Sequence, residues 1–312
     1  MKVVALAGGV GGAKLAWGLA QVLKNDELTI IVNTGDDFIH LGLNISPDID
    51  TVCYTLANLA NPSTGWGRND ECFFCLEELK KFSAPDWFNL GDKDLALHLV
   101  RTNLLKDGWT LSQVTRYLCE KMAIQQSIIP MSDTPVSTLV HTKELGVLPF
   151  QEYFVKHQCQ PTMTGVDFEG IELAELPEAG VKSLNEAERI IICPSNPWVS
   201  IQPILKVPGL RSLLSDKPVV AVSPIIGGKT VKGPAAKMFS EMGIQPSAFA
   251  VAQFYRGLIE GFVIDNVDKE QMHEIERCGI IPIAVNTLMS DNSIRIGLAK
   301  DVLAFSETLM KV

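Results

Sequence analysis

The chain has 312 residues, of which 46% are hydrophobic and 20% are charged, a balance typical of folded globular proteins. Its 36 acidic residues outnumber the 27 basic ones. The net charge of −9 argues against nucleic-acid binding, because phosphate backbones attract basic surfaces. No apolar stretch is long enough to cross a membrane, the N-terminal one is too short for a signal peptide, and the seven scattered cysteines are typical of reduced thiols. We therefore expect a cytoplasmic protein with no nucleic-acid or membrane partner.

The chain begins with a strand–helix–strand pattern. Val3–Ala7 is a continuous apolar run, residues 13–23 have helical periodicity, and Leu28–Val32 is rich in β-branched residues. Two strands joined by a helix within about thirty residues form a βαβ unit with parallel strands.

Residues 50–125 are mainly helical in pattern. Cys72 and Cys75 lie there in a C-x-x-C spacing without a second pair, so buried thiols are favoured over a metal site. Apolar residues recur at helical spacing in four segments separated by prolines and glycines: 50–59, 70–82, 93–105 and 111–122. This exceeds what one strand crossover requires, and we predict a helical insertion over residues 50–125.

The remaining chain alternates between strand and helix patterns. Ser183 and Ser247 are candidate N-caps of two helices. Strands are expected at 127–130, 138–141, 146–151, 166–173, 189–193, 218–222, 261–264 and 280–285, and helices at 233–242, 247–258 and 294–310. Residues 1–312 are thus predicted to form one α/β domain, a doubly wound, mostly parallel Rossmann-like sheet with an inserted helical subdomain.

Five apolar strands end abruptly in loops rich in glycine, proline and small polar residues. These loops follow the strands at residues 8–12, 33–37, 131–135, 194–197 and 223–224. The carboxyl ends of parallel strands lie on one edge of a sheet, where open α/β sheets bind ligands. We therefore expect the five loops to converge on a ligand site.

The first loop is a glycine-rich turn, Gly-Gly-Val-Gly-Gly, at residues 8–12. Gly9 and Gly11 match two glycines of the Rossmann fingerprint, but Lys14 stands at the third position, and the P-loop spacing is absent. Gly9, Gly11 and Gly12 would still let backbone N–H groups approach an anion, helped by the helix N-terminus and by the charge of Lys14. The turn predicts a phosphate-binding site, with a tight packing turn as the alternative.

Acidic residues gather after the second strand. Asp36, Asp37, Asp48 and Asp50 have no His or Cys partners, which suits a hard cation such as Mg²⁺ shared with phosphate oxygens. The alternative is a set of turn residues and a helix cap. The basic glycine-rich loop 227–234 is either a cover over phosphates or an ordinary solvated loop.

The sequence resembles the 2-phospholactate transferases of deazaflavin coenzyme F-420 biosynthesis, the CofD-like or FbiA-like enzymes. The resemblance runs in order through most of the chain. The matching segments are residues 8–14, 32–37, 45–51, 65–67, 90–94, 131–133, 194–197 and 223–229.

This resemblance implies a transfer that depends on Mg²⁺ as cofactor. A guanosine diphosphate ester of lactate or enolpyruvate would be the donor, and the ribityl hydroxyl of the deazaflavin Fo the acceptor, with release of GMP. Asp50, Lys93 and Trp66 would bind Fo, although many relatives carry arginine where Lys93 stands. Asp36 and Asp50 would hold the metal and be the catalytic residues, so Asp50→Asn is expected to stop transfer and leave the protein folded.

The same resemblance places Ser195 and Asn196 beside the guanosine nucleotide and implies a homodimer. Two other functions remain open. A regulatory protein that binds nucleotide-sugars would share the glycine turn and make no deazaflavin product. An NAD(P)-dependent dehydrogenase would use Asp36 to bind a ribose.

Overall fold

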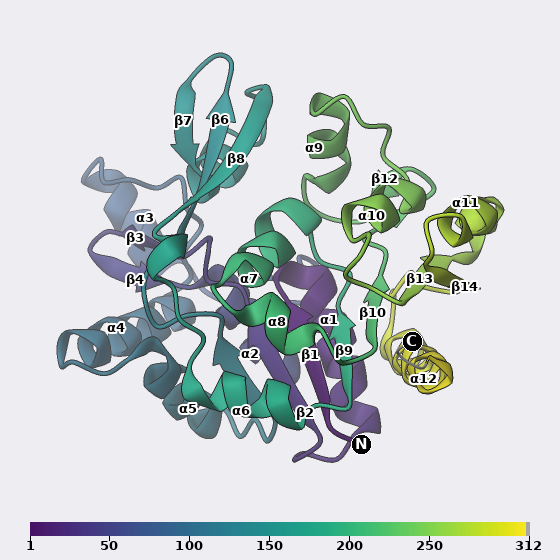
Figure 1. The fold of residues 1–312 in the computed structure, drawn as a ribbon. Helices are drawn as coiled ribbons and strands as arrows, with labels where there is room; N and C mark the ends of the chain where they lie inside the picture. The colour runs from purple at the N-terminus through teal and green to yellow at the C-terminus, as the bar shows by residue number, and fades with distance from the viewer. Residues whose placement is uncertain (310–312) are drawn as a thin grey trace.

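The computed structural model describes residues 1–309 and is built around a seven-stranded sheet in which all strands are parallel (Figure 1). The strand order is β14-β13-β10-β9-β1-β2-β5. The strands are β1 (Val3–Ala7), β2 (Leu28–Val32), β5 (Ser127–Pro130), β9 (Arg189–Ile192), β10 (Val219–Val222), β13 (Gly261–Asp265) and β14 (Ile281–Val285). The predicted doubly wound, Rossmann-like α/β class is confirmed.

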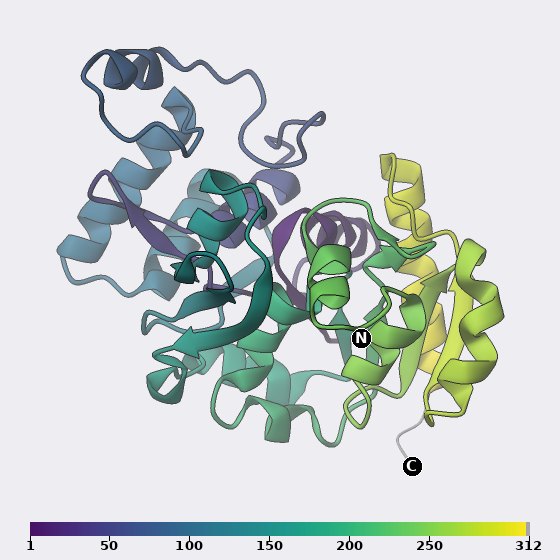
Figure 2. The same cartoon turned by 90° about the horizontal axis from the view of Figure 1, so that it is seen from above.

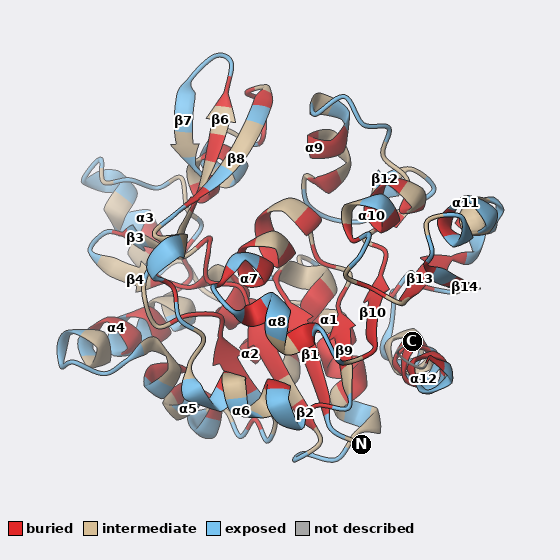
Figure 3. Ribbon diagram, viewed as in Figure 1, coloured by how far each residue is buried: buried red, intermediate tan, exposed pale blue. Residues whose placement is uncertain are grey.

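Both faces of the sheet are covered by helices, because the strands carry apolar residues on both sides (Figure 3). In β1, Val4 and Leu6 pack into one core, whereas Val3, Ala5 and Ala7 pack into the other. The second core includes α1 (Gly9–Val22), α2 (Pro47–Leu56) and α12 (Asn292–Thr308). The first includes α6 (Glu178–Glu186), α7 (Gln202–Lys206), α8 (Leu210–Leu214), α10 (Ala248–Phe254) and α11 (Met272–Glu276).

The segment predicted as a helical insertion, residues 50–125, contains most of α2 and three further helices before the chain returns to the sheet at β5. They are α3 (Phe74–Lys81), α4 (Asp92–Lys106) and α5 (Leu111–Lys121). Thr110 and Gln113 form a capping box that starts α5. Seen from above, this segment and the C-terminal third lie on opposite sides of α1 (Figure 2). The insertion thus forms one side of the molecule at the carboxyl edge of β1.

Short antiparallel strands supplement the sheet. A three-stranded unit has the order β7-β6-β8, and two hairpins pair β3 with β4 and β11 with β12. The β3–β4 hairpin was not predicted, because its turn places Leu41 as well as Gly42 at positive φ, which a leucine rarely adopts. The strands are β3 (Phe38–His40), β4 (Leu43–Ile45), β6 (Ser137–Thr142), β7 (Gly146–Pro149), β8 (Met163–Glu169), β11 (Ile225–Ile226) and β12 (Lys229–Thr230).

Two helix starts test the capping predictions. Ser247 caps α10 by accepting a hydrogen bond from the Ala250 N–H, as predicted. The prediction for Ser183 is wrong, because α6 already begins at Glu178 and Ser183 lies inside it.

The predicted end of the last helix at residue 310 lies outside the described residues. Among residues 1–309, no helix is long and apolar enough to cross a membrane. The loop 227–234 leads into α9 (Ala235–Glu241).

Candidate functional site

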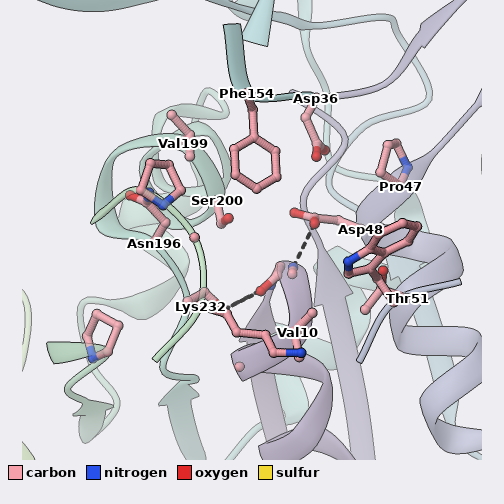
Figure 4. A pocket seen from close by; sticks show the side chains of 18 of the residues that line it. Val10, Asp36, Pro47, Asp48, Thr51, Phe154, Asn196, Val199, Ser200 and Lys232 are labelled. Atoms are coloured by element: carbon pink, nitrogen blue, oxygen red, sulfur yellow. Dashed lines mark hydrogen bonds between the residues drawn. The ribbon is translucent and has the colours of Figure 1, made fainter. Parts of the chain in front are cut away.

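A cavity of about 650 Å³ lies at the carboxyl edge of the parallel sheet (Figure 4). Four of the five predicted loops line it, namely those after β1, β2, β9 and β10. The loop after β5 is not among its lining residues, and Asp133 instead accepts hydrogen bonds from Ser112 at the start of α5. Residues 287–289 after β14 line the cavity in its place. The convergence follows from the parallel sheet, which places these strand ends together.

The glycine turn forms one wall of the cavity and begins α1. A Cβ atom on Gly11 would lie 2.3 Å from the Pro194 carbonyl oxygen, and one on Gly12 would lie 2.4 Å from the Ser195 Oγ. The glycines are therefore required for the close approach of α1 to the loop after β9. Gly9 and Gly11 line the cavity, whereas Gly12 faces Ser195. The turn therefore packs tightly, as the alternative prediction had it, and it also places the N-terminus of α1 at the cavity.

Two lysines bring positive charge to the same end of the cavity. Lys14 lines it and donates from Nζ to the Met289 carbonyl oxygen at 3.0 Å. Burial, together with the charges of Arg295 and Lys232, lowers the pKa of Lys14. Lys232 lies beside the N-terminus of α1 and donates to the carbonyl oxygen of Thr64 (Figure 4). An anion bound here would face both ammonium groups and the positive end of the helix.

Asp36 and Asp48 are held side by side by one buried amide. The Asn33 Nδ2 donates to Asp36 Oδ1 at 3.2 Å and to Asp48 Oδ2 at 3.0 Å. Gln151 donates to the other Asp36 oxygen at 3.0 Å, and the Gly9 N–H donates to Asp48 Oδ1 at 2.6 Å. Figure 4 shows the two carboxyl groups close together beside α1. Asp48 thus ties the glycine turn to the acidic pair.

Burial raises the pKa of Asp48 to about 6 and raises that of Asp36 well above its usual value, with the neighbouring Asp48 charge adding to the effect on Asp36. A raised pKa means that the folded protein favours the protonated acid. The stability that this preference contributes is full below the unfolded pKa near 4 and is lost as the pH rises through about 6.

We expect the Tm of the cation-free protein to fall by a few degrees relative to Asp48→Asn between about pH 4.5 and pH 7.5. Asparagine keeps the shape of the side chain and carries no charge to bury. Thermal melts of both proteins across this range measure the effect. A Tm difference that does not change with pH would contradict it.

Asp50 is held from behind by a buried arginine. Both of its oxygens accept hydrogen bonds from Arg101, at 3.0 Å from Nη1 to Oδ2 and by a short contact from Nη2 to Oδ1. Asp50 lies in the first turn of α2 and lines the cavity, whereas Arg101 comes from α4 and is 1% exposed. One acidic residue predicted to bind metal is therefore already paired with a cation.

The other predicted site residues divide into two groups. Trp66, Ser195 and Asn196 line the cavity. Ser195 Oγ also donates to the Gly8 carbonyl oxygen at 2.7 Å, and Asn196 accepts from the Trp198 N–H at 2.9 Å. Lys93 does not line the cavity; its exposed side chain donates from Nζ to the Asp70 carbonyl oxygen.

One further cavity residue was predicted from the sequence, and three were missed. Asp48 belonged to the predicted acidic cluster, but its link to Gly9 depends on tertiary structure. Gln151 and Phe154 come from the segment after β7, and the Phe154 ring stacks on Phe150 at 5.5 Å between ring centroids. His98 is 1% exposed, lines the cavity and lies beside Arg101. No sequence motif identifies Gln151, Phe154 or His98, because each is ordinary in its local context.

A parallel sheet with a helix N-terminus, lysines and buried carboxylates beside a cavity at its carboxyl edge defines a Rossmann-like α/β protein. A model of the family described as 2-phospho-L-lactate transferase CofD matches residues 3–298. The chain belongs to this family.

Curated relatives cover nearly the whole chain. A phosphoenolpyruvate transferase of Streptomyces coelicolor is 40% identical and covers 98% of this chain and 98% of its own. A 2-phospho-L-lactate transferase of Methanosarcina mazei is 38% identical, over 92% and 95% of the two chains. The protein of the same name from Methanocaldococcus jannaschii is also 38% identical, over 98% and 99%.

A solved structure of a UPF0052 family member from Bacillus halodurans is similar in fold. It has a TM-score of 0.62 and 13% sequence identity, covering 97% of this chain and 98% of that one. At this identity the similarity concerns the fold alone.

Proposed function

We propose that the protein transfers a 2-phospholactyl or phosphoenolpyruvyl group from a guanosine diphosphate ester to the ribityl hydroxyl of the deazaflavin Fo, with release of GMP. The observation that carries this proposal is a single cavity. One end of it is basic and contains the N-terminus of α1, and one side of it is acidic. Membership of the 2-phospho-L-lactate transferase family and the names of the relatives support the chemistry.

The donor diphosphate would bind at the basic end. There, Gly11, Lys14 and Lys232 offer a helix N-terminus and two ammonium groups. Ser195 and Asn196 line the adjoining wall, where the guanosine part would lie. Phosphoryl-type transfer depends mainly on positioning and charge neutralisation, and this end of the cavity supplies both.

The residues present also fit Mg²⁺, and Asp36 with Asp48 would hold it. Both carboxyl groups are buried and share Asn33, so a divalent cation would offset the repulsion between their charges. Among residues 1–309, no group of three or more His, Cys, Asp or Glu side chains is placed to hold a metal, but Mg²⁺ commonly binds one or two carboxylates with water and phosphate oxygens. When bound, Mg²⁺ would neutralise charge on the diphosphate.

The acceptor would lie on the side formed by the helical insertion. Asp50 and Trp66 line that side together with Phe88 and His98. Because both Asp50 oxygens already accept from Arg101, we assign Asp50 to the acceptor hydroxyls in preference to the metal. A cytoplasmic homodimer remains a prediction from the sequence.

We expect the wild-type protein, incubated with Mg²⁺, Fo and each guanosine donor, to form a deazaflavin product whose mass identifies the acid transferred. Asp36→Asn is expected to reduce this rate about 10²-fold to 10³-fold, because charge stabilisation is lost at the diphosphate. Asp301→Asn is a matched control, since Asp301 is exposed on α12. Equal rates for wild type and Asp36→Asn would remove Asp36 from the site.

The alternative is a regulatory protein that binds nucleotide-sugars through the same glycine turn. Thermal shifts with GDP, Fo and uridine diphosphate sugars separate the two functions. Stabilisation by GDP and Fo supports the transferase. Stabilisation by the sugars alone, with no mass change in the deazaflavin, would favour the alternative. The dehydrogenase alternative loses its support, since the chain belongs to a transferase family.

A further inference from the structure

A buried row of polar side chains lies behind the acceptor side of the cavity and joins α2 to α4. Arg101 is its central member and is 1% exposed. Besides its two bonds to Asp50, its Nη1 lies 3.4 Å from the Asn44 carbonyl oxygen. Two donors to two oxygens of one carboxylate fix the plane of that carboxylate as well as its position.

His98 and Asp94 continue the row. The Arg101 Nη1 lies 3.0 Å from His98 Nδ1, and because a guanidinium can only donate, Nδ1 is the acceptor. The ring proton then lies on Nε2, which faces Asp94 Oδ1 at 3.5 Å. Tyr54 donates from its hydroxyl to the same Asp94 oxygen at 2.5 Å. Each group in the row thus restricts the orientation of the next.

The row meets the cavity through some of its members only. Tyr54, Asp94, His98 and Asp50 are lining residues, whereas Arg101 is not. Each carboxylate oxygen can accept two hydrogen bonds, so Asp50 can still accept hydrogen bonds from a ligand while it is bonded to Arg101. Arg101 therefore acts on the cavity only through the groups it holds.

We propose that Arg101 is a positioning residue that holds the Asp50 carboxylate in one orientation toward the hydroxyl groups of the acceptor. This inference rests on the proposed function for the identity of the acceptor. A buried ion pair contributes little net stability compared with apolar packing of the same volume. Arg101 is therefore expected to affect mainly the recognition of Fo. His98, Asp94 and Tyr54 help to hold the arginine in place.

The first test is the kinetics of Arg101→Lys. Lysine keeps the positive charge but loses the planar guanidinium that donates to both carboxylate oxygens at once. We expect the KM for Fo to rise about 10-fold to 100-fold, while the KM for the guanosine donor stays within about 2-fold of wild type. Arg101→Met should raise the KM for Fo further. Arg116→Lys on α5 is the matched control, since Arg116 is exposed, and should match wild type. Equal changes in both KM values for Arg101→Lys would indicate a merely structural role.

The second test is a double-mutant cycle measured as the Kd for Fo by calorimetry. If Arg101 acts through Asp50, Asp50→Asn and the double variant Asp50→Asn/Arg101→Lys should bind Fo equally weakly. Independent, multiplying losses would overturn the inference. A wild-type protein that neither binds Fo nor modifies it would overturn the proposed function and this role with it. Wild-type binding that Arg101→Lys leaves unchanged would overturn the role of Arg101 alone.

Discussion

Asp50→Asn is expected to abolish transfer and also to lower the stability of the protein by about 3 kcal/mol. The sequence alone predicted that this variant would stop transfer and leave the protein folded. The structure adds the loss of stability, because Arg101 would keep its buried charge without a charged partner. Asparagine keeps one oxygen acceptor, so we expect the protein to fold, with a Tm lower by on the order of 5–10 °C.

Thermal melts and the mass-based transfer assay measure the two effects separately. Asp301→Asn again serves as the control for loss of one carboxylate. Adding Arg101→Met to Asp50→Asn removes the unpaired charge and should recover part of the lost Tm without recovering transfer. Retained transfer in Asp50→Asn would exclude Asp50 from the acceptor side, and an unchanged Tm would contradict the importance of the ion pair.

Gly11→Ala is the second substitution for which we expect a large effect. The new methyl group would lie 2.3 Å from the Pro194 carbonyl oxygen, a backbone atom that can move only with the whole loop after β9. We expect a loss of about 1–3 kcal/mol in the free energy of unfolding and a fall in transfer of about 100-fold, because Ser195 and Asn196 would move with that loop.

Gly297→Ala provides the matched control within a helix. Among residues 1–309, no atom beyond its chain neighbours and the nearby backbone of its own helix lies within 4 Å of the position of its added Cβ, and Gly297 is inside α12. This variant should gain about 0.5–1 kcal/mol, because alanine loses less conformational entropy in a helix than glycine does. Denaturant unfolding measures both variants. A Gly11→Ala protein as stable and active as Gly297→Ala would show that the loop adapts to the added methyl group.

The glycine-rich turn at the sheet edge and the fold class were predictable because their signals are local. Val3–Ala7 followed by glycines predicts a strand and a helix start, and Leu28–Val32 predicts a second parallel strand. The convergence of the loops follows from the geometry of a parallel sheet, so Asp36 and Ser195 were expected at one edge although 159 positions separate them.

The partners of these residues were not predictable in the same way. Asp48 was grouped with Asp36 by position, but its bond to Gly9 spans 39 positions. Lys93 was expected beside the acceptor, yet the start of α4 directs its side chain to Asp70. The Leu41 turn of the β3–β4 hairpin carries no sequence signal, since leucine rarely adopts a positive φ.

The sequence by itself thus determined the α/β sheet, the glycine turn at its carboxyl edge and the acidic character of the site, because apolar periodicity and strand-end loops are encoded within short windows. Only the tertiary structure decided which partners each aspartate has. Asp36 and Asp48 share an amide and remain free of cationic side-chain partners in the hydrogen bonds of the described residues, whereas Asp50 meets Arg101 across 51 positions. The physical reason is that burial and pairing set the properties of a carboxylate, and both depend on how distant segments pack.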